Sequence, residues 1–185
     1  ALRYRAVAPN FIAKIPVNRA GLQAIEAVLL EGIPVIATEV MSVAQGLAVC
    51  DMQRRVASRR ACPTLYLTHI TGIFDEHLAA RVKAEGAQID VRVLEQAGCI
   101  VARRAFAACK KTGASFTFLG GGARHLRHFT EMIGGDMHVT INWSTADEIM
   151  QINPPIENRF GASAAEKTIQ DLRDRLTVFR QAYDD

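Results

Sequence analysis

Five short runs rich in large apolar residues alternate along this chain with longer segments of helical periodicity. We predict these runs to be strands, at residues 11–16, 33–38, 64–68, 115–119 and 137–141. Runs that are mostly apolar throughout are typical of strands buried on both faces. Because parallel strands need long crossover connections, the repeated strand–helix order predicts a parallel α/β sheet. The pattern does not separate an open doubly wound sheet from part of a closed (β/α) barrel.

Capping residues mark several of the helices. Asn18 can cap the first helix after the 11–16 strand, and Ser42 can cap the next. Residues 72–113 are predicted to be mostly helical, with breaks near Gly86 and Gly98. A long final helix is predicted at about residues 163–183, because Ser163 and the glutamate three residues later have the capping-box spacing.

Length and composition limit the class of protein. A chain of 185 residues fits one domain with a sizeable core, so we treat residues 1–185 as a single domain. The net charge of +3 is too small to indicate nucleic-acid binding, and the arginines within 54–60 have no interleaved aromatic residues. The four cysteines form no metal-binding or C-x-x-C pattern, and no signal peptide or membrane-spanning run is present. We therefore expect a cytoplasmic protein with no metal, nucleic-acid or membrane partner.

Lys14 is the most unusual residue of the predicted strands. Strand alternation places it on one face with Ile12 and Pro16. A buried, unpaired ammonium group is so costly that it usually loses its proton, and a neutral amine on a rigid strand is a nucleophile for a carbonyl. The alternative is a strand-end lysine whose charged group reaches solvent, and for an isolated lysine in an apolar run this alternative is the commoner one.

Other polar residues follow the predicted strands at their carboxyl ends, where parallel α/β folds place function. Thr38 shares the face of Ile36 and could hold a water near the amine, although a threonine there can also serve only in packing. Glu39 would face outward if the strand continues through it. Thr68 and Asn142 follow the third and fifth strands in the same way.

A glycine triplet, residues 120–122, ends the fourth predicted strand. Its backbone N–H groups could approach an anion at the start of a following helix, and Arg124 would add a charged donor. Glycines at such a turn also occur for purely conformational reasons. His125 and His128 are predicted to be surface residues, because no third metal ligand accompanies them.

Several motifs resemble the transaldolase family, most closely its short fructose 6-phosphate aldolase branch. The resembling stretches are Ala13–Val17, Ala20–Ile25, Glu31–Val35, Ala44–Leu47, Leu119–Arg124 and Ile133–Ile141. The resemblance implies a (β/α)8 TIM-type barrel, of which this chain carries the fourth to eighth βα units. It also implies a class I, Schiff-base aldolase or transaldolase that needs no metal or organic cofactor.

The resemblance assigns roles to individual residues. Lys14 would form the imine on the fourth strand, and Thr38 on the fifth strand would help to hold the catalytic water. Arg124, with Gly121 and Gly122, would bind the distal anionic end of a sugar or sugar-phosphate substrate, and Thr68 and Asn142 are further candidate contacts. The long final helix would cross the barrel mouth or contact a neighbouring subunit, and a homo-oligomer is expected.

The sequence also departs from the family pattern. The first three strands, with their aspartate and their Glu or Gln, are expected on a segment or chain that supplies them. Ile73 stands in place of a phosphate-binding arginine, Ile70 in place of a catalytic tyrosine, and Gly122 in place of a serine. His69 or Tyr66 could replace the lost polar groups. A catalytically diverged binding or assembly protein is therefore the alternative hypothesis, followed by an unrelated α/β ligand-binding domain.

Overall fold

The computed structural model describes residues 1–184 and contains a five-stranded parallel sheet in sequential order. The strands are β1 (Ala13–Pro16), β2 (Val35–Val40), β3 (Leu65–Ile70), β4 (Thr117–Gly121) and β5 (Met137–Val139). All five predicted strands are confirmed, and every neighbouring pair is parallel. The strand order is sequential and has no reversal, which differs from a doubly wound sheet and is consistent with a (β/α) barrel type of fold.

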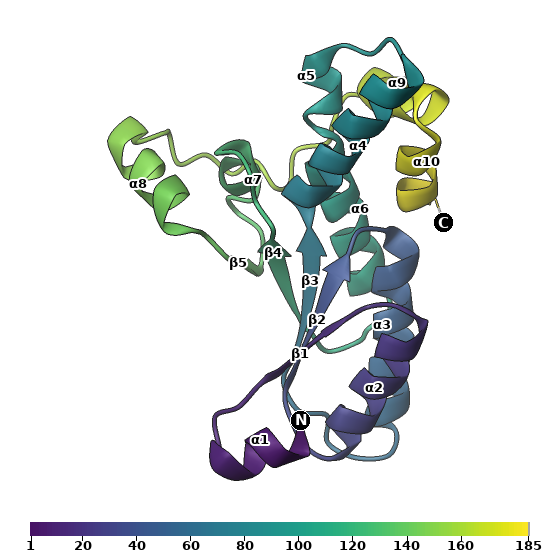
Figure 1. The fold of residues 1–185 in the computed structure, drawn as a ribbon, viewed down its shortest axis with the longest axis vertical. Coiled ribbons are helices and arrows are strands. Elements are labelled where there is room, and N and C mark those ends of the chain that lie inside the picture. The colour runs from purple at the N-terminus through teal and green to yellow at the C-terminus, as the bar shows by residue number, and fades with distance from the viewer. Residues whose placement is uncertain (185) are drawn as a thin grey trace.

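Helices connect the strands and lie mainly on one side of them. They are α1 (Leu2–Val7), α2 (Arg19–Leu30), α3 (Val43–Ala57), α4 (Thr71–Glu85), α5 (Val91–Leu94), α6 (Ala97–Lys111), α7 (Arg127–Thr130), α8 (Trp143–Ile152), α9 (Glu166–Arg175) and α10 (Thr177–Asp184). The predicted caps are confirmed, because Asn18 accepts a hydrogen bond from the Gly21 amide and Ser42 accepts one from the Gln45 amide. Figure 1 shows α2, α3 and α6 on one side of the sheet, while α1 and α8 project on the other.

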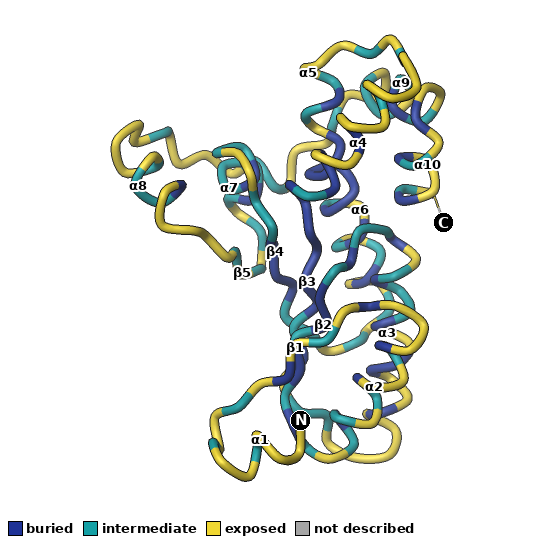
Figure 2. The backbone as a smooth tube through the Cα atoms, viewed as in Figure 1, coloured by how far each residue is buried: buried dark blue, intermediate teal, exposed yellow. Residues whose placement is uncertain are grey.

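The two faces of the sheet differ in burial (Figure 2). On the helix-covered face Val35, Ala37 and Leu67 are fully buried and pack in one core with residues of α2 and α3. On the opposite face Lys14 is exposed and Tyr66 is only partly buried. The prediction that the strands are buried on both faces is therefore met only in part: the open face is exposed near the amino ends of the strands, whereas Thr38, Thr68 and Ile70 near the carboxyl ends are buried.

The predicted long final helix is also wrong, because the structure has two shorter helices. Leu176 separates α9 from α10 with an extended backbone (φ −126°, ψ 100°) and places its side chain, 2% exposed, in a second core. Ala165, not Ser163, precedes the first turn of α9, and no side chain caps it. Both helices pack against α4 and α6 of the same chain.

Predictions from the sequence also concern helix breaks, cysteines and membrane-spanning segments. Gly86 ends α4 in the left-handed conformation (φ 65°) as expected, and the break predicted near Gly98 falls at Glu95 and Gln96, between α5 and α6. All four cysteines are free thiols. Across residues 1–184 the helices are too short or too polar for any of them to cross a membrane.

Candidate active site

Lys14 lies in the middle of β1, on the open face of the sheet. The sheet register pairs it with Ile36 on β2, and Ile36 with Tyr66 on β3, so the three side chains form one row across the open face. Ala13 on the opposite face is 5% exposed, which confirms the predicted alternation. The prediction of a buried Lys14 is not met in this chain, because no helix covers the face on which it lies and its side chain is exposed.

Two threonines lie one step further toward the carboxyl ends of the strands, on the same face. Thr38 follows Ile36 by two residues and Thr68 follows Tyr66 by two, so Thr38 is the diagonal neighbour of Lys14. They are 4% and 3% exposed, and neither hydroxyl has a hydrogen-bond partner among the described residues. A buried hydroxyl without a partner loses about 1–3 kcal/mol of solvation. These two hydroxyls therefore provide a site for a water or a polar group of a ligand.

A bulge in β2 positions Thr38. The register shifts between Ala37 and Val40, and Glu39 has a left-handed backbone (φ 60°) that is uncommon for a residue with a side chain. The shift returns Val40 to the helix-covered face, where it is fully buried and pairs with His69. Thr38 is thereby the last β2 residue on the open face, and it lies within the irregular stretch.

The glycine triplet serves close packing in this structure. A Cβ at Gly121 would lie 3.0 Å from Cγ2 of Thr68, and one at Gly122 would lie 2.5 Å from Cγ2 of Ile70. Gly122 also has φ 62°, which favours glycine. The predicted anion site at a helix start is not formed as expected, because α7 begins only at Arg127 and has 4 residues.

Arg124, the predicted anion-binding residue, already contacts a carboxylate. Its Nε lies 3.0 Å from Oε1 of Glu76 on α4, and its Nη1 donates to the carbonyl oxygens of Gly122 (3.3 Å) and Ala123 (3.2 Å). Both side chains of the ion pair remain partly exposed, at 40% and 56%. Arg124 is thus held at the carboxyl ends of β3 and β4, with its charge matched.

A buried Asp75–His128 pair, which sequence reasoning missed, anchors the loop that carries Arg124. His128 is 1% exposed, so its predicted surface position is wrong. Its Nδ1 accepts hydrogen bonds from the amides of Arg124 (3.0 Å) and His125 (3.2 Å), so Nε2 carries the proton and donates to Oδ2 of Asp75 (2.9 Å). Oδ1 of Asp75 accepts from the Gly98 amide at 2.6 Å. Asp75 lies three residues before Leu78, on the apolar side of the predicted helix. A carboxylate at such a position is the sequence signal that could have indicated a buried pair.

His69 and Tyr66, the two proposed substitutes for lost polar groups, point to opposite faces. His69 is fully buried against Phe118 on the helix-covered face, and neither ring nitrogen has a partner among residues 1–184. Burial lowers its pKa to about 3. Tyr66 lies on the Lys14 face, with its ring 5.9 Å from that of His138. Only Tyr66 therefore shares a face with the candidate nucleophile.

Asn142, the last predicted contact, caps α8. Its side chain accepts a hydrogen bond from the Thr145 amide at 2.9 Å, and the residue is exposed at the end of the segment that follows β5. A helix cap accounts for its polar side chain without a ligand.

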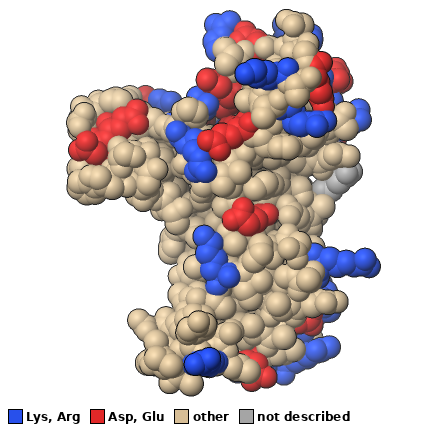
Figure 3. Space-filling view, in the orientation of Figure 1, with Lys and Arg blue, Asp and Glu red and all other residues tan. Residues whose placement is uncertain are grey.

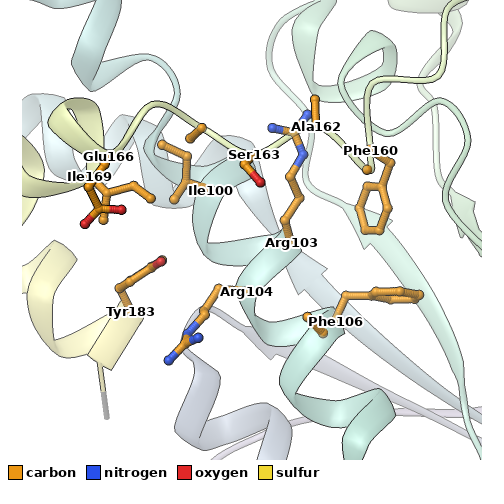
Figure 4. A pocket seen from close by; sticks show the side chains of 13 residues that line it. Ile100, Arg103, Arg104, Phe106, Phe160, Ala162, Ser163, Glu166, Ile169 and Tyr183 are labelled. Carbon is orange, nitrogen blue, oxygen red and sulfur yellow. The ribbon is translucent and has the colours of Figure 1, made fainter.

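A cavity of about 480 Å³ lies away from Lys14, between α6 and the segment that leads into α9 (Figure 4). Arg103, Arg104, Phe160 and Tyr183 are among its lining residues, and the guanidinium of Arg104 lies 5.3 Å from the centre of the Tyr183 ring. This cavity belongs to the helix layer and its lining contains none of the candidate site residues.

Comparison with known families places the chain in one of them. The family model for "Transaldolase/Fructose-6-phosphate aldolase" matches residues 1–184. The chain belongs to this family. Its lysine strand, glycine triplet and Arg124 are therefore parts of a transaldolase-type fold.

Individual relatives match over a shorter region. A transaldolase of Mycobacterium tuberculosis is 34% identical over 110 residues, which cover 56% of this chain and 30% of the relative. Transaldolases of Mycolicibacterium paratuberculosis (36% over 107 residues; 54% and 29%) and Mycolicibacterium smegmatis (32% over 117 residues; 60% and 32%) are similar to it to the same degree. The matched region thus spans under one third of each of these relatives.

Proposed function

We propose that this protein is a class I aldolase or transaldolase that forms a Schiff base between Lys14 and a ketose-type sugar or sugar phosphate. One observation carries the proposal: Lys14 shares an open sheet face with Thr38 and Thr68, whose buried hydroxyls have no partner among residues 1–184. An amine next to an unfilled polar site is the arrangement that imine chemistry needs, since water must be lost and regained beside the nitrogen.

The reaction follows from the chemistry of the amine. Neutral Nζ of Lys14 attacks the ketone carbon and the adduct becomes a neutral carbinolamine, whose hydroxyl takes up a proton and leaves as water to give a protonated imine. A base then removes the proton from the hydroxyl beside the bond to be broken. The electrons of that carbon–carbon bond move into the imine, which releases an aldehyde and leaves an enamine. The enamine attacks an acceptor aldehyde or takes up a proton, and water then releases the product from Lys14.

The surrounding residues have proposed roles in binding. Thr38 and Thr68 hold the water that enters and leaves at the imine. Arg124, beside Gly121 and Gly122, binds the distal end of the donor, and Asn142 is given no role because its side chain caps α8. No metal or organic cofactor is needed, because the protonated imine itself accepts the electrons.

We further propose that three additional parallel strands complete a barrel around this face. The outer edges of β1 and β5 pair with no strand among the described residues, and Lys14 is exposed where a barrel interior would cover it. Large apolar side chains are exposed beside both edges, including Tyr4 on α1 and Trp143 on α8, at 65% and 78%. A segment or second chain that supplies these strands, and a homo-oligomer of the complete unit, would be detected by native mass measurement.

Borohydride trapping tests the proposed nucleophile. Borohydride reduces the imine to a stable secondary amine, so incubation with dihydroxyacetone should add the donor's mass to the peptide that contains Lys14. Lys14→Ala should abolish the label, while Lys83→Ala, which removes an exposed lysine on α4, should retain it. Label that persists in Lys14→Ala would overturn the assignment. Absence of label in the wild type would favour the diverged binding protein.

A further inference from the structure

Among residues 1–184, two arginines near the carboxyl ends of β3 and β4 each form an ion pair with a glutamate: Arg124 with Glu76 and Arg127 with Glu95. We propose that the distal end of the site selects a neutral polyhydroxy ketose over its phosphate ester, with Glu76 as the residue that sets this preference. The inference rests on the proposed function and narrows its substrate class. The residue concerned, Glu76 on α4, is not among the residues assigned to the imine chemistry.

Glu76 occupies the position where an anion would approach Arg124. Its Oε1 lies 3.0 Å from Nε of Arg124, so one edge of the guanidinium already faces a carboxylate. Nη1 donates to the carbonyl oxygens of Gly122 and Ala123, which bend the arginine back over its own loop. A phosphate that binds here must therefore displace Glu76 or lie beside its negative charge.

The neighbouring cations cannot compensate. Nη1 of Arg127 lies 3.1 Å from Oε2 of Glu95, and His128 is neutral because Nδ1 accepts hydrogen bonds while Nε2–H donates to Asp75. Acidic and basic side chains accordingly lie next to one another over the upper part of the surface in Figure 3, around α4 and α5, without a patch of one sign. The ends of β3 and β4 thus offer little net positive charge to a dianion.

Apolar side chains lie next to Gly122, at the end of β4. A Cβ placed at Gly122 would contact Ile70 and Ile73 at 2.5 Å and 3.5 Å, so both isoleucines close over the end of β4. These side chains can contact the carbon skeleton of a sugar but cannot donate a hydrogen bond to phosphate oxygens.

A neutral polyol fits the remaining groups. Its hydroxyls can donate to the carboxylate of Glu76 and accept from the guanidinium of Arg124, so the ion pair stays intact when the sugar binds. A phosphate dianion at the same place would be repelled by Glu76, and a double negative charge within ~4 Å of a single one can change an equilibrium by about tenfold or more even in a well-solvated site.

Paired donors that differ only in the distal phosphate test this inference. Borohydride trapping on Lys14 should be measured over a range of concentrations of D-fructose and of fructose 6-phosphate, for the wild type, Glu76→Gln and Glu95→Gln. Comparing each variant with the wild type removes the effect of the different open-chain fractions of the two sugars. Glu95→Gln is the matched control, because it removes the same charge from the ion pair with Arg127.

We expect Glu76→Gln to raise the trapping efficiency for fructose 6-phosphate relative to D-fructose by about tenfold, with Glu95→Gln unchanged. The effect should shrink in high salt, because exposed charges are screened. An unchanged ratio in Glu76→Gln, or the same change in both variants, would overturn the inference while leaving the Schiff-base function intact. Failure of both sugars to label Lys14 in any variant would overturn the inference together with the proposed function.

Discussion

The side-chain amide of Gln45 donates a hydrogen bond to the carbonyl oxygen of Val17 at 2.8 Å, which joins the first turn of α3 to the residue that follows β1. The same nitrogen lies 3.3 Å from the carbonyl oxygen of Glu39, and Oε1 accepts from the Met41 amide at 2.8 Å. One side chain thus links the ends of the two strands that carry Lys14 and Thr38.

Replacing Gln45 should therefore loosen this corner of the sheet. Gln45→Leu removes three hydrogen bonds to backbone groups, and we expect the free energy of unfolding to fall by about 1–3 kcal/mol in urea denaturation. Gln151→Leu is the matched control, because the one side-chain hydrogen bond of Gln151 among residues 1–184 is to Asp147 on its own helix, at the surface. Equal stability of the two variants would show that the corner does not depend on Gln45.

His69 should make stability depend on acidity. Its pKa is about 3 in the folded protein because of burial, against an ordinary value of 6.5. Below pH 6.5 the unfolded chain therefore binds a proton that the folded chain does not. The free energy of unfolding should fall as the pH drops from 6.5 toward 3, by up to about 1.4 kcal/mol per pH unit from this residue, with no effect above that range.

His69→Phe tests this dependence. The variant should flatten the slope of unfolding free energy against pH between 6 and 4.5 by up to about one proton, measured by urea denaturation at several pH values. His77→Phe is the control, because His77 is an exposed histidine on α4. If the slope is the same in His69→Phe and the wild type, the imidazole is not held neutral in the fold.

The sequence predicts the sheet well because its signals are local. Each apolar run is long enough to specify a strand, and Asn18 and Ser42 cap helices through bonds to residues only 3 positions away. The alternation that places Lys14 opposite Ala13 is equally local. The family resemblance added the role of Lys14, which no local pattern supplies.

The failures involve contacts between distant residues. Asp75 and His128 are 53 positions apart, and Arg124 and Glu76 are 48 apart, so neither pairing can be inferred from spacing. The break at Leu176 has the same origin, because packing of α9 and α10 against α4 and α6 overrides a continuous helical pattern. The exposure of Lys14 depends on which elements cover the open face, and the sequence around Lys14 does not contain that information.

Gly122 should tolerate no side chain. At φ 62° a Cβ is strained, and it would also lie 2.5 Å from Cγ2 of Ile70. Gly113 has a similar backbone (φ 72°), but nothing lies within 4 Å of a Cβ built on it. Gly113→Ala should therefore lose only the backbone strain, about 1 kcal/mol, and Gly122→Ala should lose about 1–3 kcal/mol more because of the clash. Thermal unfolding of both variants measures the difference, and equal losses would exclude a packing role for Gly122.

The Asp75–His128 pair should be sensitive to an exchange of one oxygen for nitrogen. In Asp75→Asn the amide oxygen can still accept from Gly98, but its NH2 group would then face the Nε2–H of His128, so two donors would meet in a buried site. We expect a loss of about 2–4 kcal/mol in unfolding free energy, because buried donors without an acceptor are costly. Glu76→Gln on the same helix removes an exposed carboxylate and should change stability by less than about 1 kcal/mol.

In the wild type, the ¹⁵N spectrum should show the proton of His128 on Nε2, and a proton on Nδ1 would contradict the hydrogen-bond arrangement that holds the Arg124 loop.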